Sequence, residues 1–460
     1  MAAAPEAELE LTPAEAEESL VADVTAALES DEPQRAAERT AALHPADIAD
    51  LFEQIAPHLR LSLARALGDQ LDSNVFAEMS EWVRDALLEE LPNTEVAEVI
   101  GDMDTDDAVA VVEELDPEDK AEVLAGLYAA DRVAIEEALT FPEESAGRIM
   151  RRDPQAAPEH WTVRQAIDHL RAEQPDDTDF WELFVVDPAH CPVGTIRLSW
   201  LLTAPTTLKL TDVMQREQTL IPVEMDQEEV ANLFQKYALI SAAVTDSAGR
   251  LVGVITVDDI LHIVQQEASE DILRLAGAGD ESDLNVPIPK VVRVRLYWLV
   301  INLGTAILAS SVVGLFQGAI ERLVVLATLM PIVSGMGGNA GTQTLAVVVR
   351  ALATGQLTTS TTRRAIAREM TIAAANGLAL GTLIGLGVTI RYSNLLLGAV
   401  MGAAMLINNL VAGAAGVLIP VFLDRRGIDP AVSSAVFVTT MTDCMGFFSF
   451  LGLAVLTGLA

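Results

Sequence analysis

Hydrophobic residues are concentrated in the second half of this chain. Five segments there are almost free of charged residues, and they cover residues 296–320, 323–349, 370–390, 392–423 and 430–460. Each is longer than the roughly 20 residues with which an α-helix crosses a bilayer. The alternative, a soluble protein with five such core helices in a row, would be unusual. The pattern therefore predicts an all-α, polytopic membrane domain of five helices in the lipid bilayer, over residues 291–460.

The first half shows two other patterns, so the chain is predicted to be multidomain. From residue 20 to 138, hydrophobic residues recur at helical spacing. This predicts an α-superhelical domain over residues 19–144, after a disordered acidic tail at residues 1–18. From residue 145 to 271, a unit of helix, strand, turn, strand and helix occurs twice, with a period of about 60 residues. We expect α+β repeats at 145–210 and 211–266, then a linking helix at 267–290.

Charge divides the chain at the same place. The first 285 residues contain 62 acidic and 18 basic side chains, whereas the remaining 175 contain 5 and 11. An acidic surface repels phosphate, which disfavours nucleic acid as a partner, and it attracts divalent cations. Cys191 and Cys444 lie alone in separate halves, so no disulfide is expected. No signal peptide is expected either, because the N-terminus lacks a basic start and an apolar core.

Basic residues predict how the membrane domain is oriented. If the N-terminus is inside, nine basic residues fall in loops on the cytoplasmic side and only Arg322 and Arg391 fall outside. Loops rich in Lys and Arg stay in the cytoplasm. We therefore expect a multi-pass protein with cytoplasmic N-terminal domains and an external C-terminus.

A single carboxylate interrupts the last hydrophobic segment. Asp443 lies near its middle, where a charged side chain costs about 2.5–3.5 kcal/mol to insert, and no basic residue lies at a similar depth. We interpret Asp443 as a cation site flanked by Thr439 and Thr440, which precede it by four and three residues. The alternative is a protonated Asp that is hydrogen-bonded to a neighbouring helix.

A glycine-rich stretch at residues 331–343, which contains Gly338 and Asn339, interrupts the second segment. Four glycines within seven positions make a poor ordinary helix. The stretch fits either an unwound backbone beside a water-filled path or a tight Gly-xxx-Gly contact between helices. In the fourth segment, Asn408 and Asn409 are typical of hydrogen bonds between membrane helices.

Five short motifs together resemble the MgtE-type family of magnesium channels and transporters. They are His44-Pro45-Ala46-Asp47, Glu144-Ser145-Ala146-Gly147-Arg148-Ile149-Met150, Glu267-Ala268-Ser269-Glu270-Asp271, Gly335-Met336-Gly337-Gly338-Asn339-Ala340-Gly341-Thr342-Gln343 and Thr440-Met441-Thr442-Asp443. The tandem α+β repeat likewise resembles a pair of CBS domains. The resemblance covers the chain from about residue 43 to its end. It implies a prokaryotic inner or plasma membrane protein that forms a homodimer around one pore.

The resemblance also implies a function and a set of site residues. Family members take up Mg²⁺ through the pore, and cytoplasmic Mg²⁺ closes it by bridging carboxylates of the helical domain, the CBS pair and the linking (plug) helix. The implied pore residues are Asp443, Thr439, Thr440, Asn339 and Gly338. The implied regulatory ligands are Asp106, Asp107, Asp226, Glu228, Asp259, Glu267, Glu270, Asp271 and Asp429. An adenine nucleotide such as ATP is implied for the CBS cleft, with Asp258 at the ribose.

Two positions depart from the family pattern. Ala238 stands where an Asp is usual, and His262 stands where an acid is common. At least one regulatory site is therefore expected to be weaker, absent or pH-sensitive.

Each of three other functions would require features that differ from those of a magnesium channel. An ion-coupled secondary transporter of divalent cations would use Asp443 to exchange a proton for metal, and its flux would follow a pH gradient. An intramembrane metalloprotease requires His-Glu-x-x-His in a membrane helix, but all six His residues precede Pro287, so we expect no enzyme. An adenine-nucleotide sensor with a membrane anchor would need neither the glycine-rich stretch nor Asp443.

Overall fold

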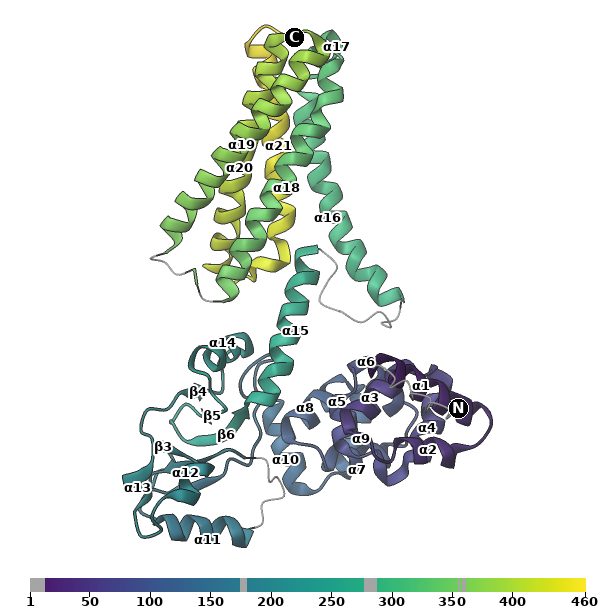
Figure 1. The fold of residues 1–460 in the computed structure, drawn as a ribbon, viewed down its shortest axis with the longest axis vertical. Coiled ribbons are helices and arrows are strands. Elements are labelled where there is room, and N and C mark those ends of the chain that lie inside the picture. The colour runs from purple at the N-terminus through teal and green to yellow at the C-terminus, as the bar shows by residue number, and fades with distance from the viewer. Residues whose placement is uncertain (1–12, 174–179, 277–287, 355, 358–360) are drawn as a thin grey trace, which may run out of the picture. The chain divides into compact units, whose positions relative to one another are not determined.

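The computed structural model of the chain is mostly helical and divides into two compact units, Met1–Leu261 and His262–Ala460 (Figure 1). It describes residues 13–173, 180–276, 288–354, 356–357 and 361–460. The predicted disordered tail therefore lies largely outside the described residues. Where it is described, at residues 13–18, the prediction was wrong, because a helix begins at Pro13. Proline at the first helical position and Glu15 in the first turn both favour a helix start.

The N-terminal domain of the first unit is entirely helical, as the hydrophobic spacing predicts. Its elements are α1 (Pro13–Glu29), α2 (Pro33–Thr40), α3 (Pro45–Gln54), α4 (Pro57–Leu67), the 3₁₀ turn η1 (Gly68–Gln70), α5 (Ser73–Glu78), α6 (Glu81–Leu88), α7 (Asn93–Gly101), α8 (Thr105–Glu114), α9 (Pro117–Gly126) and α10 (Ala129–Ala138). Proline opens α2, α3, α4 and α9, where its missing N–H loses no helical hydrogen bond. Phe52, Leu63 and Phe76 are fully buried in one continuous core.

Two small sheets of identical topology follow. The first repeat contains β1 (Ala156–Pro158), α11 (Val163–Glu173), β2 (Glu182–Val186), β3 (Pro192–Arg197) and α12 (Leu198–Thr203). The short helix α13 (Leu210–Val213) leads to the second repeat. That repeat contains β4 (Leu220–Pro222), α14 (Gln227–Tyr237), β5 (Ser241–Thr245), β6 (Leu251–Thr256) and α15 (Val257–Ala276). In each sheet a parallel pair is extended by an antiparallel hairpin. The predicted tandem repeat is confirmed. The sequence analysis missed β1 and β4, which span only three residues each and are too short to show an alternating pattern.

The last helix of the second repeat continues into the predicted linking helix. α15 runs without a break from Val257 to Ala276, so no boundary occurs at residue 267, where the sequence analysis placed one. This stretch contains neither Gly nor Pro, which explains why nothing interrupts the helix. The remainder of the predicted linking helix, at 277–287, lies outside the described residues.

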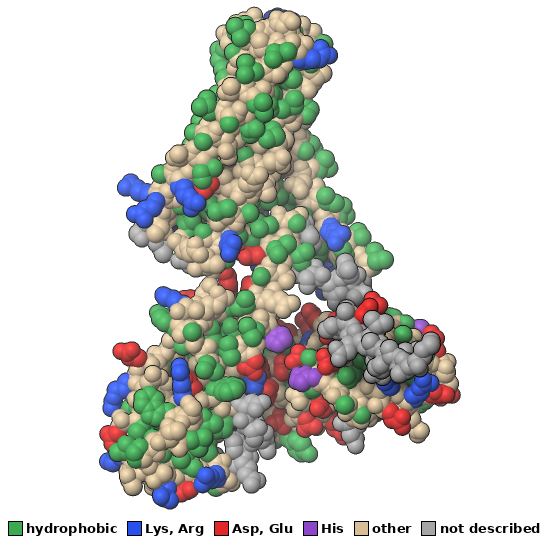
Figure 2. All heavy atoms as spheres, in the orientation of Figure 1, with side chains coloured by type: hydrophobic (Ala, Val, Ile, Leu, Met, Phe, Trp, Pro, Cys, Tyr) green, Lys and Arg blue, Asp and Glu red, His purple; other side chains and the backbone are tan. Residues whose placement is uncertain are grey.

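The second unit is a bundle of long apolar helices. They are α16 (Ile288–Gly314), α18 (Val325–Ala353), α19 (Thr362–Tyr392), α20 (Leu395–Asp424) and α21 (Pro430–Leu456), with the short α17 (Gln317–Arg322) after α16. Four of them satisfy the length and hydropathy of a membrane span, namely α16, α19, α20 and Ser434–Leu456 within α21. The glycine-rich stretch lowers the mean hydropathy of α18. Figure 2 shows hydrophobic side chains over these helices and a dense gathering of acidic side chains on the first unit.

The glycine-rich stretch is helical throughout, with Pro331 inside α18. A Cβ atom at Gly337 would lie 2.0 Å from Nδ2 of Asn408 in α20, and one at Gly341 would lie 2.5 Å from Cγ1 of Val438 in α21. The interpretation as a tight helix contact is therefore confirmed, and the alternative of an unwound backbone is wrong. A Cβ at Gly338 would meet no other atom within 4 Å, so this position faces open space within the unit.

Candidate functional site

The close contact of α18 with α21 brings the two polar features of the membrane segments together. Ser334 of α18 donates a hydrogen bond from its Oγ to Oδ1 of Asp443 in α21. Asp443 is half-buried, and among the described residues it forms no ion pair with a basic side chain. The sequence analysis missed Ser334, although this small polar residue lies within the glycine-rich stretch that had been singled out.

The other predicted pore residues lie on the same two helices but do not hydrogen-bond to Asp443. The hydroxyls of Thr439 and Thr440 donate to carbonyl oxygens of their own helix, at 2.8 Å and 2.6 Å. Their oxygen lone pairs are left to accept hydrogen bonds. Asn339 is exposed and Gly338 is partly exposed on α18.

A buried asparagine fixes the contact of the three central helices. Asn408 of α20 donates from Nδ2 to the backbone carbonyl of Val333 in α18, at 2.9 Å. Its side chain also lies against Gly446 of α21, where a Cβ would come within 2.8 Å of Nδ2. The predicted interhelical role is confirmed for Asn408. It is wrong for Asn409, whose amide donates to the carbonyl of Met405 in the same helix.

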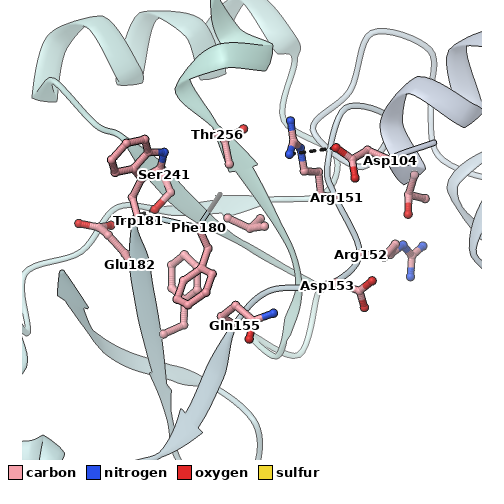
Figure 3. A pocket seen from close by; sticks show the side chains of 13 residues that line it. Asp104, Arg151, Arg152, Asp153, Gln155, Phe180, Trp181, Glu182, Ser241 and Thr256 are labelled. Carbon is pink, nitrogen blue, oxygen red and sulfur yellow. Dashed lines mark hydrogen bonds and ion pairs between the residues drawn. The ribbon is translucent and has the colours of Figure 1, made fainter. Parts of the chain in front are cut away.

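In the first unit, five carboxylates gather around one arginine, and we call these six residues the Arg151 cluster. Asp104, Asp106 and Asp107 lie at the start of α8, and Asp258 and Asp259 lie in the first turn of α15. Arg151 Nη1 lies 3.0 Å from Asp104, its Nη2 lies 3.2 Å from Asp258 and 2.8 Å from Asp259, and its Nε lies 3.9 Å from Asp106. Figure 3 shows the guanidinium reaching Asp104.

The structure thus brings together three of the predicted regulatory ligands, Asp106, Asp107 and Asp259. It adds three residues that the sequence analysis did not predict as metal ligands or their partners: Asp104, Arg151 and Asp258, which had been predicted at the ribose. Carboxylate oxygens of Asp104, Asp106 and Asp107 lie within 4.8 Å of one another, a spacing at which one cation can contact all three. The only sequence signal for Asp104 was its place in an acidic run. The only sequence signal for Arg151 was its position directly after the motif that ends at Met150.

Crowding changes the protonation of this cluster. Burial raises the pKa of Asp106 well above its usual value, and the negative charges of Asp259 and Asp107 raise it further. Burial, followed by the charges of Asp259 and Asp104, raises the pKa of Asp107 to about 6, although Arg151 and Arg84 oppose this shift. Oδ1 of Asp106 is buried and has no hydrogen-bond partner among the described residues. The cluster therefore favours binding of a proton or a further cation.

A second group of acids lies around Arg274 in the second unit. Arg274 forms ion pairs with Glu270, one turn earlier in α15, and with Asp429 at the start of α21, where Nη1 lies 2.7 Å from Oδ2. Asp429 also caps α21 by accepting a hydrogen bond from the backbone N–H of Ala431. Burial and then the charge of Asp429 raise the pKa of Asp271. Three predicted ligands therefore meet here, again with an unforeseen arginine.

The remaining predicted ligands lie outside these two groups of acids. Asp226 is the N-cap of α14 and accepts from the backbone N–H of Glu228, and neither joins a group of three acids among the described residues. Glu267 lies on α15. Of the two departures from the family pattern, Ala238 occupies the left-handed C-cap of α14 and His262 is exposed on α15. A group that the sequence analysis missed, Glu81, Asp85 and Glu114, also has its carboxylates within 4.8 Å of one another.

A pocket opens beside the Arg151 cluster. Figure 3 shows Arg151, Arg152, Trp181, Ser241 and Thr256 around it. Arginines, an aromatic face and hydroxyls are groups that bind phosphates, a base and a ribose. Asp258, predicted at the ribose, is not among the residues that line the pocket and instead pairs with Arg151.

The raised pKa of Asp107 predicts how pH acts on the first unit when chelator removes metal. An exposed Asp ionises near pH 3.8, so folding binds protons between about pH 4 and 6, and this stabilisation is lost as pH rises through about 6. Asp107→Asn should therefore raise the unfolding midpoint relative to wild type by several degrees at pH 7.5 and by roughly half as much at pH 5.

The midpoints would be measured by calorimetry of the purified protein in EDTA. Glu95→Gln, which neutralises an exposed acid of α7, should leave the midpoint unchanged at both pH values. A lower midpoint for Asp107→Asn at pH 7.5 would show instead that Arg151 needs this negative charge.

Comparison with known proteins places this architecture in a family. A model described as "Divalent cation transporter" matches residues 330–453, the MgtE intracellular N domain matches 43–144, and a CBS domain matches 210–266. The cytosolic domain of the Mg²⁺ channel MgtE, solved in complex with ATP, is similar with a TM-score of 0.50 and 25% identity, over 53% of this chain and 99% of that one.

Full-length relatives are similar over most of their length. The magnesium transporter MgtE of Bacillus subtilis is 32% identical over 318 residues, which cover 69% of this chain and 70% of the relative. The magnesium transporter MgtE of Thermus thermophilus is 33% identical over 317 residues, which cover 68% and 70%. This chain, a multi-pass membrane protein and not an enzyme, therefore belongs to the MgtE family of magnesium transporters.

Proposed function

We propose that this protein is a channel for Mg²⁺ uptake across a prokaryotic inner or plasma membrane, with Asp443 as the ion-binding residue of its pore. The observation that carries the proposal is the half-buried Asp443 of α21, which accepts a hydrogen bond from a neutral hydroxyl of α18 and, among the described residues, forms no ion pair with a basic side chain. The names of the relatives from Bacillus subtilis and Thermus thermophilus support Mg²⁺ as the transported ion.

The chemistry around Asp443 suits a hydrated Mg²⁺. This ion requires octahedral oxygen coordination and releases its water reluctantly. A carboxylate and the lone pairs of Thr439 and Thr440 can accept hydrogen bonds from coordinated water, which holds the ion without stripping it. Weak binding of this kind lets an ion leave as well as enter, as conduction requires.

A homodimer would complete this pore. Gly335, Gly338 and Asn339 of α18 present an open side of the unit, since a Cβ at either glycine would meet no atom within 4 Å. In a membrane, small residues allow another helix, or an ion with its water, to come close. We place the second subunit against this side of α18 and α21, so that each subunit contributes one Asp443 to a shared path.

We further propose that cytoplasmic Mg²⁺ closes the channel by binding the acidic clusters. The carboxylates of the Arg151 cluster and those of Glu270, Asp271 and Asp429 are crowded, and each cluster has an Asp whose pKa is raised. Such crowding opposes closure unless a cation is bound, because like charges at 4 Å repel by about 4 kcal/mol at an effective dielectric near 20. A ligand that binds the closed form better shifts the equilibrium toward it.

An adenine nucleotide is proposed for the pocket beside Arg151. Arg151 and Arg152 supply positive charge for phosphates, Trp181 supplies a stacking face, and Ser241 and Thr256 supply hydroxyls. The ATP complex of a related cytosolic domain supports this assignment.

The pore assignment predicts that Asp443→Ala abolishes Mg²⁺ transport. Removing the carboxylate removes the ion-binding charge, so Mg²⁺ flux into proteoliposomes without a pH or sodium gradient should fall by at least tenfold. Asp424→Ala, which removes an exposed acid at the end of α20, is the matched control and should transport normally.

Normal flux through Asp443→Ala would contradict the pore assignment. Wild-type flux that starts only when a proton gradient is imposed would favour an ion-coupled secondary transporter instead.

The gating proposal predicts that Mg²⁺ protects the cytoplasmic unit from protease. Millimolar Mg²⁺ should slow tryptic cleavage of the full-length protein by about fivefold, because bound cations hold the domains together. Asp271→Asn combined with Asp429→Asn should weaken this protection, whereas Glu118→Gln, at an exposed site of α9, should not. Equal cleavage of the wild type with and without Mg²⁺ would refute gating.

A further inference from the structure

Ser334 is the one side chain described in the structure that donates a hydrogen bond to Asp443. We propose that Ser334 is a positioning residue that orients the Asp443 carboxylate and sets its affinity for the transported ion. This inference rests on the proposed role of Asp443 in the pore.

The geometry distinguishes the two carboxylate oxygens. Oδ1 accepts the Ser334 hydroxyl, and within the described residues Oδ2 accepts no hydrogen bond. A hydroxyl stabilises the carboxylate but brings no charge, so the full negative charge stays available to an ion. An arginine at the same place would form a salt bridge and compete with the cation. Fixing one oxygen also reduces the rotational freedom that Asp443 loses when an ion binds.

The backbone around Ser334 is held firmly. Val333, its neighbour, accepts the amide hydrogen bond of the buried Asn408, and Gly337, one turn later, lies against the same amide. α18 is therefore hydrogen-bonded to α20 beside Ser334, and the same amide packs against Gly446 of α21. The hydroxyl consequently acts from a fixed position, as preorganised binding requires.

The test is the concentration dependence of Mg²⁺ flux in proteoliposomes. Ser334→Ala should raise the Mg²⁺ concentration for half-maximal flux about tenfold, the factor that corresponds to ~1.4 kcal/mol, while the maximal flux stays within about threefold of wild type. Ser334→Thr keeps the hydroxyl and should restore the wild-type value. Thr328→Val removes a hydroxyl of the same helix that serves only its own backbone, and should behave as wild type.

A half-saturating concentration unchanged in Ser334→Ala, or a Ser334→Thr variant as impaired as Ser334→Ala, would overturn the inference. Either result leaves the pore assignment intact, because that assignment is decided separately by the loss of flux in Asp443→Ala.

A different observation, the ion pairs of Arg151, carries a second inference. Arg151 follows Met150 in the segment between the N-terminal domain and the first repeat, and it bonds to acids of both α8 and α15. We infer that Arg151 is a built-in cation that keeps part of the contact between the N-terminal domain and the second CBS repeat when no metal is bound, and that Mg²⁺ completes this contact.

The position of Arg151 suits this role. Its backbone N–H and carbonyl pair with Val254 of β6, at 2.8 Å and 3.0 Å, which ties its main chain to the second repeat. Its side chain is only 17% exposed and that of Asp259 only 16%, so this ion pair is shielded from water. One guanidinium has five donors in a planar fork and can serve several carboxylates at once. A single positive charge cannot offset five carboxylates, so Mg²⁺ adds to Arg151 and does not replace it.

The test compares hydrogen exchange of the full-length protein in EDTA and in Mg²⁺ at one pH. In EDTA, amides of α8 should exchange at least tenfold faster in Arg151→Gln than in wild type, and Mg²⁺ should restore most of the protection. Arg151→Lys, which keeps the charge but loses the fork, should give an intermediate rate. Arg250→Gln is the matched control, because Arg250 pairs with Asp246 in the turn between β5 and β6, outside the cluster.

Equal exchange of wild type and Arg151→Gln in EDTA would overturn this inference. Mg²⁺ that protects neither protein would refute gating by Mg²⁺, but the effect of Arg151 in EDTA would be decided independently of that result.

Discussion

A carboxyl group in the middle of a membrane helix needs a polar partner, and the close packing of the membrane unit supplies one. Asp443 would be expensive in an apolar environment on its own. The hydroxyl of Ser334 reaches it because α18 approaches α21 closely along Gly341 and Val438. Asn408 fixes the same approach from α20. Small residues, a buried amide and one hydroxyl thus hold a single carboxyl group in place.

The first unit meets the opposite problem, because it has too many carboxylates in one place. Five acids of α8 and α15 lie close to Arg151, and burial together with the charges of Asp259 and Asp104 raises the pKa of Asp107 although Arg151 opposes this shift. Arg274 has the same relation to Glu270 and Asp429. In the proposed gating, clusters that are partly neutralised in this way are stable enough to form and would still respond to a divalent cation. That balance is what an ion-sensitive switch requires.

Most of the fold could be predicted from periodic patterns in the sequence. Hydrophobic runs, helical spacing and a 60-residue repeat predicted the membrane helices, the helical N-terminal domain and the CBS pair, all of which depend on residues that are near in sequence. Motifs predicted Asp443 and many acids of the clusters. The three-residue strands β1 and β4 were missed because they are too short for any period to appear.

Partners that act across long sequence distances could not be predicted. Ser334 and Asp443 are 109 positions apart, Arg151 and Asp258 are 107 apart, and Arg274 and Asp429 are 155 apart. No local pattern marks such pairs, since they exist only once the helices have packed. The choice between an unwound and a helical glycine-rich stretch likewise depended on the neighbouring α20 and α21, not on α18 itself.

The central claim is that Mg²⁺ moves passively past Asp443, and a reversal potential tests it most directly. Currents through the purified protein in a planar bilayer would be recorded under a tenfold Mg²⁺ gradient, with and without a pH gradient. Passive conduction predicts reversal near 30 mV per tenfold gradient, the value for a divalent ion at 25 °C, unchanged by pH. A reversal potential that shifts with the pH gradient would contradict the account and would identify transport coupled to protons.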